Sequence, residues 1–339
     1  MKSSAVPVAV IGASGYTGLE LLKLLANHPY FEPVYVATSE GESRTERLHP
    51  ALEGVMSLPV EKADADAVAA VAELAFLALP HKTAMGFAKA LLKRGVKVVD
   101  LSADYRLAQE TYEAWYCPHE DPEHLPEAVY GLPEYYRDEI AKTRLVANPG
   151  CYPTASLLGL LPFASYLKKG APLFVDAKSG VSGAGKKLSS TTHYVTINEN
   201  IFAYNPLKHR HGPEIAEKLA DRGGVEVPVR FVPHLLPVTR GMLCTLYLQV
   251  EGDFDPTALL RERYADEPFV RVREKPVDIK SVAGTHFCDL FAVKEGESLI
   301  VTSAIDNLLR GASSQALANA NLICGLPETT GLPTLAYVP

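Results

Sequence analysis

The sequence predicts an α/β protein that begins with a doubly wound parallel sheet and continues with a second, α+β domain built on a mixed sheet. Three observations support this prediction. In the first half, short continuous apolar runs alternate with helical patterns, as buried parallel strands with helices on both faces do. A glycine-rich turn follows the first run. After residue 150 the β-rich runs are spaced more widely, and few helical patterns separate the later ones.

The expected elements follow in chain order. In the first half they are strands at 6–11, 33–38, 74–79, 96–101 and 144–147, and helices at 19–26 and 84–93. In the second half they are a helical run at 155–161 and β-rich segments at 173–177, 225–232, 242–250, 286–293 and 298–305. A last helix over 307–323 carries closely spaced small residues, so it should pack tightly. With 339 residues the chain is long enough for about two domains, which we place at 1–150 and 151–305.

The composition excludes several classes of function. Lysine and arginine total 33 against 40 acidic residues, so the net charge is −7, and no basic run suggests nucleic-acid binding. Anionic metabolites remain possible, because a local pocket can be positive. No apolar run is long enough to span a membrane, and the start of the chain reads as a first strand rather than a signal peptide. The five scattered cysteines favour a reducing cytoplasm over a disulfide framework.

The glycine-rich turn is the first candidate site. Gly12, Gly15 and Gly18 follow a strand and open a helix, which is the context of a dinucleotide-binding turn. Glycines let the backbone approach a pyrophosphate, and the helix N-terminus supplies amide donors. The alternative is a tight strand-to-helix turn without a ligand. We predict a cofactor site that includes the intervening side chains Ser14, Tyr16 and Thr17.

The end of the second strand separates NAD from NADP. An acidic residue there, about 20 residues after the glycines, usually binds the ribose 2′-hydroxyl of NAD. Here Ser39 precedes Glu40, and Arg44 and Arg47 follow. Small hydroxyls with a nearby arginine suit a 2′-phosphate, although the acidic Glu40 favours NAD. We therefore expect NADP(H), with Ser39 and Arg44 as contacts.

A candidate nucleophile lies at Cys151, in the stretch NPGCYPT, where a strand ends and a helical run begins. The dipole of a helix N-terminus lowers the pKa of a thiol and favours the reactive thiolate. The alternative is a buried cysteine that packs as a small hydrophobic group. The other four cysteines fit that alternative, because they lie in apolar or strand contexts.

A base for this thiol is expected in the densest polar cluster, KHRHGPEI at 208–215. Pro213 fits a first helical turn and Gly212 a cap before it. His209 and His211 are then expected on an extended segment with their rings on one side. The alternatives are a metal-binding pair or a solvated loop, but no third ligand stands nearby, and we predict no metal site.

Three further polar patches follow predicted strands. Arg106 could bind a phosphate or carboxylate, or pair with Asp104. A second glycine loop contains Ser182 and Gly183, and its alternative is an ordinary flexible turn. Pro80 and His81 stand at a strand end that should face a cofactor, where His81 could equally be a helix-start residue.

The motifs together resemble the N-acetyl-γ-glutamyl-phosphate reductase family of arginine biosynthesis. The matching stretches are GASGYTG at 12–18, LALPH at 77–81, VVDLSADYRL at 98–107, YGLPE at 130–134, LVANPGCYPTA at 145–155, DAKSGVSGAGK at 176–186, HRHGPEI at 209–215, FVPHLLPVTRG at 231–241 and AIDNLLRGASSQALANAN at 304–321. The resemblance covers nearly the whole chain in order. It implies a Rossmann-type NADP domain, to which residues 306–339 return, and a catalytic and dimerisation domain like that of aspartate-semialdehyde dehydrogenases.

The resemblance also implies a reaction and a set of residues. The reaction is NADPH-dependent reduction of N-acetyl-L-glutamyl 5-phosphate to the 5-semialdehyde through a cysteine thioester, with release of phosphate. Cys151 falls on the nucleophile, and the catalytic histidine falls in the pair His209 and His211, of which we prefer His209, with Glu214 in support. The expected site is completed by Asn307 for the cofactor and by Ser102, Arg106, Asn148 and Arg240 for the substrate.

Two other functions stay open at this point. One is a reductase of a carrier-protein-bound aminoadipyl phosphate in lysine biosynthesis, which should depart from NPGCYPT. The other is a non-catalytic NADP(H) sensor, for which Cys151 and the histidine pair would have no purpose. We expect a cytoplasmic homo-oligomer, dimer or tetramer, that binds small molecules and neither nucleic acid nor membrane.

Overall fold

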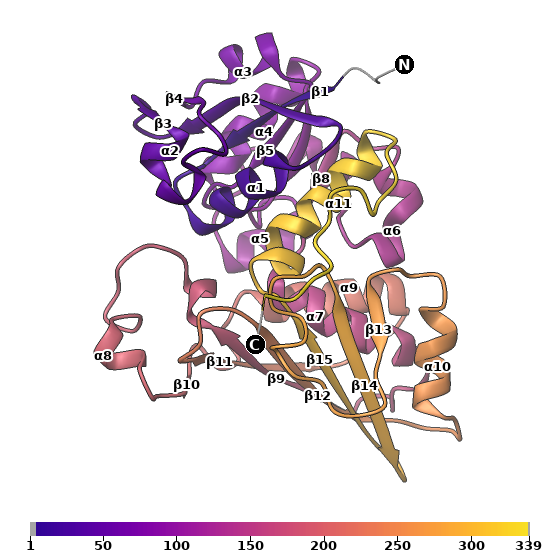
Figure 1. Cartoon of the computed structure of the whole chain (residues 1–339). Helices are drawn as coiled ribbons and strands as arrows, with labels where there is room; N and C mark the ends of the chain where they lie inside the picture. The colour runs from indigo at the N-terminus through magenta and orange to yellow at the C-terminus, as the bar shows by residue number, and fades with distance from the viewer. Residues whose placement is uncertain (1–4, 338–339) are drawn as a thin grey trace. The chain divides into compact units, whose positions relative to one another are not determined.

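A computed structural model describes residues 5–337, and the chain divides into two compact units (Figure 1). The first comprises Met1–Pro149 and Ala312–Leu332, and the second comprises Gly150–Gly311 and Pro333–Pro339. The last helix therefore belongs to the first unit. Residues 306–311 and 333–337, which the sequence grouped with the first domain, lie in the second unit. Within the described residues, no helix is both long and apolar enough to cross a membrane.

The first unit is built on an eight-stranded sheet with the order β3-β4-β2-β1-β5-β6-β8-β7. Its pairs are parallel except for β3 against β4. The strands are β1 (Val6–Ile11), β2 (Phe31–Thr38), β3 (Ser43–Arg44), β4 (Pro59–Lys62), β5 (Leu74–Leu77), β6 (Lys97–Asp100), β7 (Ala128–Tyr130) and β8 (Leu145–Ala147). The strand order reverses at β1, which pairs with β2 on one side and β5 on the other. Ligands of such sheets bind where the order reverses.

Helices cover both faces of this sheet. They are α1 (Tyr16–Ala26), α2 (Thr45–Leu48), α3 (Ala65–Val71), α4 (Thr83–Lys93), α5 (Gln109–Trp115), α6 (Pro133–Ile140) and α11 (Ser314–Ile323). Helices α3 and α4 pack together, and their apolar side chains join Ala9, Ile11 and Val98 of the strands in one core. Helix α11 packs on α1 and α6, which confirms the close packing expected from its small residues. Both sheet faces are thus buried, as the continuous apolar runs predicted.

The second unit contains a seven-stranded mixed sheet with the order β10-β11-β9-β12-β15-β14-β13. Its strands are β9 (Leu173–Gly180), β10 (Phe202–Ala203), β11 (Val229–Leu236), β12 (Met242–Gln249), β13 (Val270–Val272), β14 (Cys288–Glu295) and β15 (Ser298–Ile305). Helices α7 (Cys151–Leu160), α9 (His211–Gly223) and α10 (Pro256–Arg263) pack against its strands, and a short helix, α8, spans Tyr194–Ile197. The predicted fold class, a doubly wound sheet followed by an α+β domain, is confirmed.

Several element bounds differ from the sequence-based expectation. Strand β11 was expected at 225–232 and spans Val229–Leu236, because its partner β9 fixes the register from Val229 opposite Leu173 to Leu236 opposite Gly180. Strand β14 was expected at 286–293 and starts at Cys288, where it pairs with Ile305 of β15. The last helix was expected from residue 307 and starts at Ser314, after a π-helical turn over Leu309–Ser313.

Candidate active site

The glycine turn follows β1 at the point where the strand order reverses. Gly12 has a φ of +93°, and a Cβ there would lie 2.2 Å from the carbonyl oxygen of Ala78. Gly18 packs as closely, because its Cβ would lie 2.6 Å from the carbonyl oxygen of Gly12. A Cβ at Gly15 would meet no atom of the described residues within 4 Å. Two glycines thus shape the turn, and the third leaves open space at the N-terminus of α1, which suits a phosphate.

Two side chains bind backbone carbonyls of this turn, and the sequence did not indicate either contact. The ring Nε2 of His49, a buried side chain, lies 2.7 Å from the carbonyl oxygen of Ala13. The Ser313 hydroxyl, just before α11, donates a hydrogen bond of 3.0 Å to the carbonyl oxygen of Thr17. These bonds fix the backbone at Ala13 and Thr17, on either side of Gly15, where we expect a nicotinamide dinucleotide to bind.

The candidate 2′-phosphate contacts follow the end of β2 in the chain. Ser39 and Glu40 are exposed beyond Thr38. The Arg44 guanidinium pairs with Glu46 at 3.1 Å and donates to the Ser57 hydroxyl at 2.6 Å, while 43% of its side chain stays exposed. The Arg44 guanidinium is thus held by Glu46 and Ser57, and its contact with a 2′-phosphate stays a prediction.

Cys151 is the first residue of α7, with Gly150 as the N-cap. The Gly150 amide donates a hydrogen bond of 2.9 Å to Oε1 of Glu214, a side chain that is 1% exposed. The Gly150 carbonyl accepts from the Thr154 amide and from its hydroxyl, both at 3.0 Å. Glu214 was expected to support the histidine, which stays a prediction, and the structure shows that it anchors the turn in front of the cysteine. That the start of α7 favours a thiolate at Cys151 stays a prediction.

The two histidines lie side by side, with ring centroids 4.8 Å apart. The prediction that both occupy an extended segment is wrong, because α9 already begins at His211 and Gly212 lies inside it. The physical reason is local hydrogen bonding. The His211 amide donates to Nδ1 of His209 at 3.1 Å, and the Gly212 amide donates to the His209 carbonyl at 3.0 Å. These bonds close a turn that leads directly into the helix.

Aromatic rings surround His209. Its ring stands edge-on to Tyr152, Tyr204 and Phe231, with centroids 5.8, 5.5 and 5.3 Å away. Burial among these rings, with a smaller contribution from Arg210, lowers the pKa of His209 to about 4. His209 is therefore neutral at pH 7, and because Nδ1 accepts the His211 amide, its proton resides on Nε2. Tyr152 also binds the Tyr204 hydroxyl at 3.0 Å, a pairing that only the structure reveals.

The strand-end patch around Arg106 is more tightly bonded than expected. The Arg106 Nε donates to the Asn148 carbonyl at 2.7 Å and Nη2 donates to the Leu101 carbonyl at 2.8 Å. The Ser102 hydroxyl donates to Asp100 at 2.6 Å, and burial, followed by the nearby Asp104 charge, raises the pKa of Asp100 to about 7. These side chains fix the backbone at the carboxyl ends of β6 and β8. Substrate contacts from Ser102 and Arg106 stay predictions.

Asn148 and His81 complete the predicted residues of the first unit. The Asn148 side chain is 1% exposed, donates to the Ala312 carbonyl at 3.2 Å and accepts from Asn319 at 3.0 Å, so it ties β8 to the last helix. Pro80 and His81 are exposed at the end of β5, and the His81 ring stands edge-on to Tyr116 with centroids 5.3 Å apart. Neither arrangement tests the predicted roles, which are substrate binding by Asn148 and cofactor binding by Pro80 and His81.

In the second unit, the predicted Ser182, Asn307 and Arg240 come together at one end of the sheet. Asn307 donates to the Ser182 hydroxyl at 3.0 Å and accepts from the Gly241 amide at 2.8 Å. Beside Ser182, a Cβ at Gly183 would lie 2.8 Å from Oγ of Ser179, so that loop is closely packed. Arg240 pairs with the fully buried Asp306 at 3.1 Å. Its charge is thus balanced within the protein, and anion binding by Arg240 stays a prediction.

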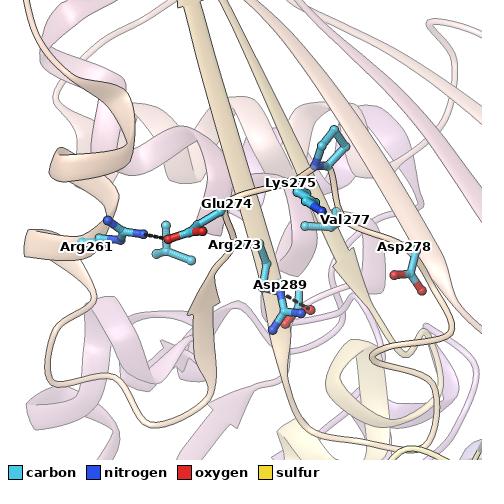
Figure 2. A pocket seen from close by; sticks show the side chains of 9 residues that line it. Arg261, Arg273, Glu274, Lys275, Val277, Asp278 and Asp289 are labelled. Atoms are coloured by element: carbon cyan, nitrogen blue, oxygen red, sulfur yellow. Dashed lines mark hydrogen bonds and ion pairs between the residues drawn. The ribbon is translucent and has the colours of Figure 1, made fainter.

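Two other polar features lie outside the predicted site. A cavity of about 560 Å³ is lined by charged side chains of α10 and of the segment from β13 to β14, among them Arg261, Arg273 and Asp289 (Figure 2). Within the described residues, one group of three side chains could hold a metal ion, namely Asp121, Glu123 and His124. Lys89 already pairs with that glutamate at 2.7 Å.

Comparison with known proteins supports the fold described above. Residues 7–143 match the family model described as the semialdehyde dehydrogenase NAD-binding domain, and residues 151–307 match the semialdehyde dehydrogenase dimerisation domain. The chain is 65% identical to the N-acetyl-gamma-glutamyl-phosphate reductase of a Sulfurovum species, with 98% of this chain and 100% of the relative covered. It is 63% identical to the enzyme of that name from Wolinella succinogenes, over 98% of this chain and 99% of the relative.

Solved structures support the fold. Aspartate semialdehyde dehydrogenase II from Vibrio cholerae, in complex with ASA, superposes with a TM-score of 0.74 at 15% identity, over 95% of this chain and 99% of that one. The aspartate semialdehyde dehydrogenase of Candida albicans with NADP gives a TM-score of 0.70 at 13% identity, over 95% and 99% of the two chains.

Proposed function

Because the chain belongs to the N-acetyl-gamma-glutamyl-phosphate reductase family, we propose that it reduces N-acetyl-L-glutamyl 5-phosphate to N-acetyl-L-glutamate 5-semialdehyde with NADPH in arginine biosynthesis. The observation that carries this proposal is the turn at Cys151. A cysteine begins α7, a buried glutamate anchors the residue before it, and a neutral histidine belongs to the same unit.

The proposed chemistry starts with the thiol. Nδ1 of the neutral His209 accepts the thiol proton when it releases the His211 amide, and the Cys151 sulfur attacks the acyl carbon of the substrate. The carbon–oxygen bond to phosphate breaks, phosphate leaves, and a thioester with Cys151 remains. We expect backbone amides at the start of α7 to stabilise the oxyanion that forms on the way.

The second half of the reaction reduces the thioester. NADPH supplies the hydride for this step when it is bound at the glycine turn. The proton held by His209 neutralises the oxygen of the resulting thiohemiacetal, whose carbon–sulfur bond then breaks to release the aldehyde. The Cys151 sulfur regains its starting state. Across the whole reaction one hydride and one proton are consumed for each phosphate released.

The proposal is tested by mixing the protein with NADPH and the acyl phosphate while following the absorbance of the reduced nicotinamide. We expect NADPH oxidation that requires the acyl phosphate and yields equal amounts of aldehyde and phosphate. Tight NADPH binding without turnover would contradict the proposal and favour a sensor of the cofactor's redox state. The aminoadipyl phosphate on a carrier protein serves as the comparison substrate, for which we expect no turnover.

We propose that the cofactor is NADPH rather than NADH, and Arg44 provides the test. Replacing Arg44 by alanine should lower the ratio of kcat/KM for NADPH over NADH by about 10-fold or more, because a hydrogen bond to a charged group contributes roughly 1.5–3 kcal/mol. Activity with NADH should change little. Arg261→Ala is the control, since it removes an exposed guanidinium paired with Glu274 in the second unit. A wild-type enzyme that prefers NADH would show that Glu40 controls the pocket.

We also propose a homo-oligomer formed through the open face of the second sheet. Phe174, Tyr247, Ile300 and Val293 are directly opposed across β9, β12, β15 and β14, and they are 36% to 49% exposed. Neighbouring strands thus present a continuous apolar row, which is typical of a protein–protein contact. A shallow apolar hollow beside the row is lined by Phe174, Tyr247 and residues of β11.

Replacing Phe174 and Tyr247 together by aspartate should lower the molar mass in solution, measured by light scattering, to that of a smaller species. The reason is that two carboxylates would have to be buried without partners. Val55→Asp, which adds a charge at an exposed apolar residue of the first unit, is the control and should keep the wild-type mass. An unchanged mass in the double variant would exclude this face as the interface.

A further inference from the structure

We propose that Gly311 is a positioning residue for the nucleophile: the π-helical turn at Leu309–Ser313 holds the backbone of Gly311 against Cys151, and this contact sets where the cysteine stands. The inference rests on the proposed function, because it takes Cys151 as the nucleophile. It adds a requirement that the proposed mechanism does not contain, namely that residue 311 carries no side chain.

The contact between Gly311 and Cys151 is unusually close. A Cβ at residue 311 would lie 2.6 Å from the Cβ of Cys151 and 3.2 Å from its Cα. Real Cβ atoms essentially never approach other atoms to less than 3.0 Å. The atoms that it would meet are not at the end of a flexible side chain, since they belong to the first residue of α7. A side chain at 311 would therefore displace either the start of α7 or the turn itself.

The backbone conformation alone does not require glycine at this position. Thirteen glycines of the described chain have a positive φ that disfavours other residues, and Gly311 is not among them. Alanine would be accepted at 311 by the local backbone, and only the neighbouring cysteine excludes it. The contact with Cys151 is therefore the reason that residue 311 carries no Cβ.

Asp306 fixes the turn on one side. Its Oδ1 accepts the amides of Leu308 and Leu309 at 2.8 and 2.9 Å, and its backbone carbonyl accepts the Gly311 amide at 2.9 Å. Its Oδ2 accepts the Gly284 amide at 2.7 Å, and Arg240 balances its charge. One buried carboxylate therefore links the turn to two neighbouring loops, so the turn cannot easily retreat from Cys151.

Arg310 fixes the turn on the other side. Its side chain is fully buried, and Nη1 lies 2.8 Å from Nε2 of the equally buried His286. Burial, followed by the Arg310 charge, keeps the pKa of His286 well below its ordinary value, so the ring is neutral and can accept this hydrogen bond. The His286 amide in turn donates to the Pro333 carbonyl at 2.8 Å. π-helical turns are rare and frequently occur at functional sites.

The test compares Gly311→Ala with Gly86→Ala. Gly86 lies inside α4, and a Cβ there would meet no described atom within 4 Å, so this control adds the same methyl group without a contact. The readouts are the rate of Cys151 alkylation by iodoacetamide, kcat, KM and the dissociation constant of NADPH. We expect Gly311→Ala to lower kcat by about 10²-fold, because a displacement of about 1 Å can cost that much. Alkylation should slow at least several-fold, while NADPH binding stays at the wild-type value.

Asp306→Asn provides a second measurement that does not add a methyl group beside Cys151. It weakens the support of the turn, and we expect Cys151 alkylation to change several-fold in rate there as well. This variant also decides the case in which Gly311→Ala fails to fold. Wild-type alkylation and kcat in Gly311→Ala would overturn the proposal, as would a wild-type alkylation rate in Asp306→Asn. Alkylation needs neither cofactor nor acyl phosphate, so altered alkylation in a protein without reductase activity would reject the proposed function alone.

Discussion

Replacing Cys151 by serine is expected to abolish reductase activity while leaving NADPH binding intact. Serine keeps the shape of the side chain, but its hydroxyl does not ionise at neutral pH and forms no thioester. Loss of a covalent nucleophile typically costs about 10⁴-fold or more in kcat. The glycine turn belongs to the other unit, so the dissociation constant of NADPH, measured by fluorescence titration, should stay at the wild-type value.

The other cysteines supply the controls for this experiment. Burial raises the pKa of Cys324 to about 11, and burial likewise raises the pKa of Cys244. Both thiols are therefore protonated at neutral pH and unreactive. Cys324→Ala should keep near-normal turnover, and iodoacetamide should label Cys151 before the other cysteines. Normal turnover in Cys151→Ser would reject the thioester mechanism.

Replacing His209 by asparagine should lower kcat by about 10²–10⁴-fold, which is the usual contribution of general acid–base catalysis. Asparagine keeps a polar side chain at this position but cannot carry a proton between steps. KM for the acyl phosphate and the affinity for NADPH should change far less. His211→Asn is the matched comparison, because its ring lies beside His209 and its amide supports the His209 ring. A large kcat loss in His211→Asn alone would reverse the assignment within the pair.

The pH dependence provides an independent check on His209. Because burial lowers its pKa from 6.5 to about 4, the neutral form that accepts a proton persists down to about pH 4. The acid limb of kcat/KM due to this group should therefore lie near pH 4, and His209→Asn should lose it. If the limb lies near pH 6.5 and survives in that variant, another group accepts the proton.

The same pKa shift predicts a stability effect. In the unfolded chain His209 binds a proton near pH 6.5, whereas in the folded chain it does so only near pH 4. The unfolded state thus binds more protons between these values, and the free energy of unfolding falls as the pH drops from about 6.5 to 4. The fall should be smaller in His209→Asn, as measured by denaturant unfolding at a series of pH values.

Local patterns in the sequence identified the elements that present the candidate site. The glycine turn, the cysteine at the start of a helix and the histidine cluster are each formed by residues that follow one another closely in the sequence. Their chemistry is therefore visible in short motifs. Strands β1 and β15 have the predicted bounds, because a continuous apolar run between clear turns marks both ends. The extended segment expected at His209 and His211 was wrong, because a side-chain hydrogen bond between them starts the helix early.

The sequence by itself determined the fold class and the family and predicted the candidate reactive groups, since these depend on local hydrophobic patterns and short motifs. Only the tertiary structure decided which residues contact these groups. Glu214 binds the amide of Gly150 from 64 residues away, Asp306 balances Arg240, and Gly311 leaves room for Cys151. The physical reason is that such contacts depend on which elements pack together and in which register, and neither the composition of a segment nor its periodicity carries that information.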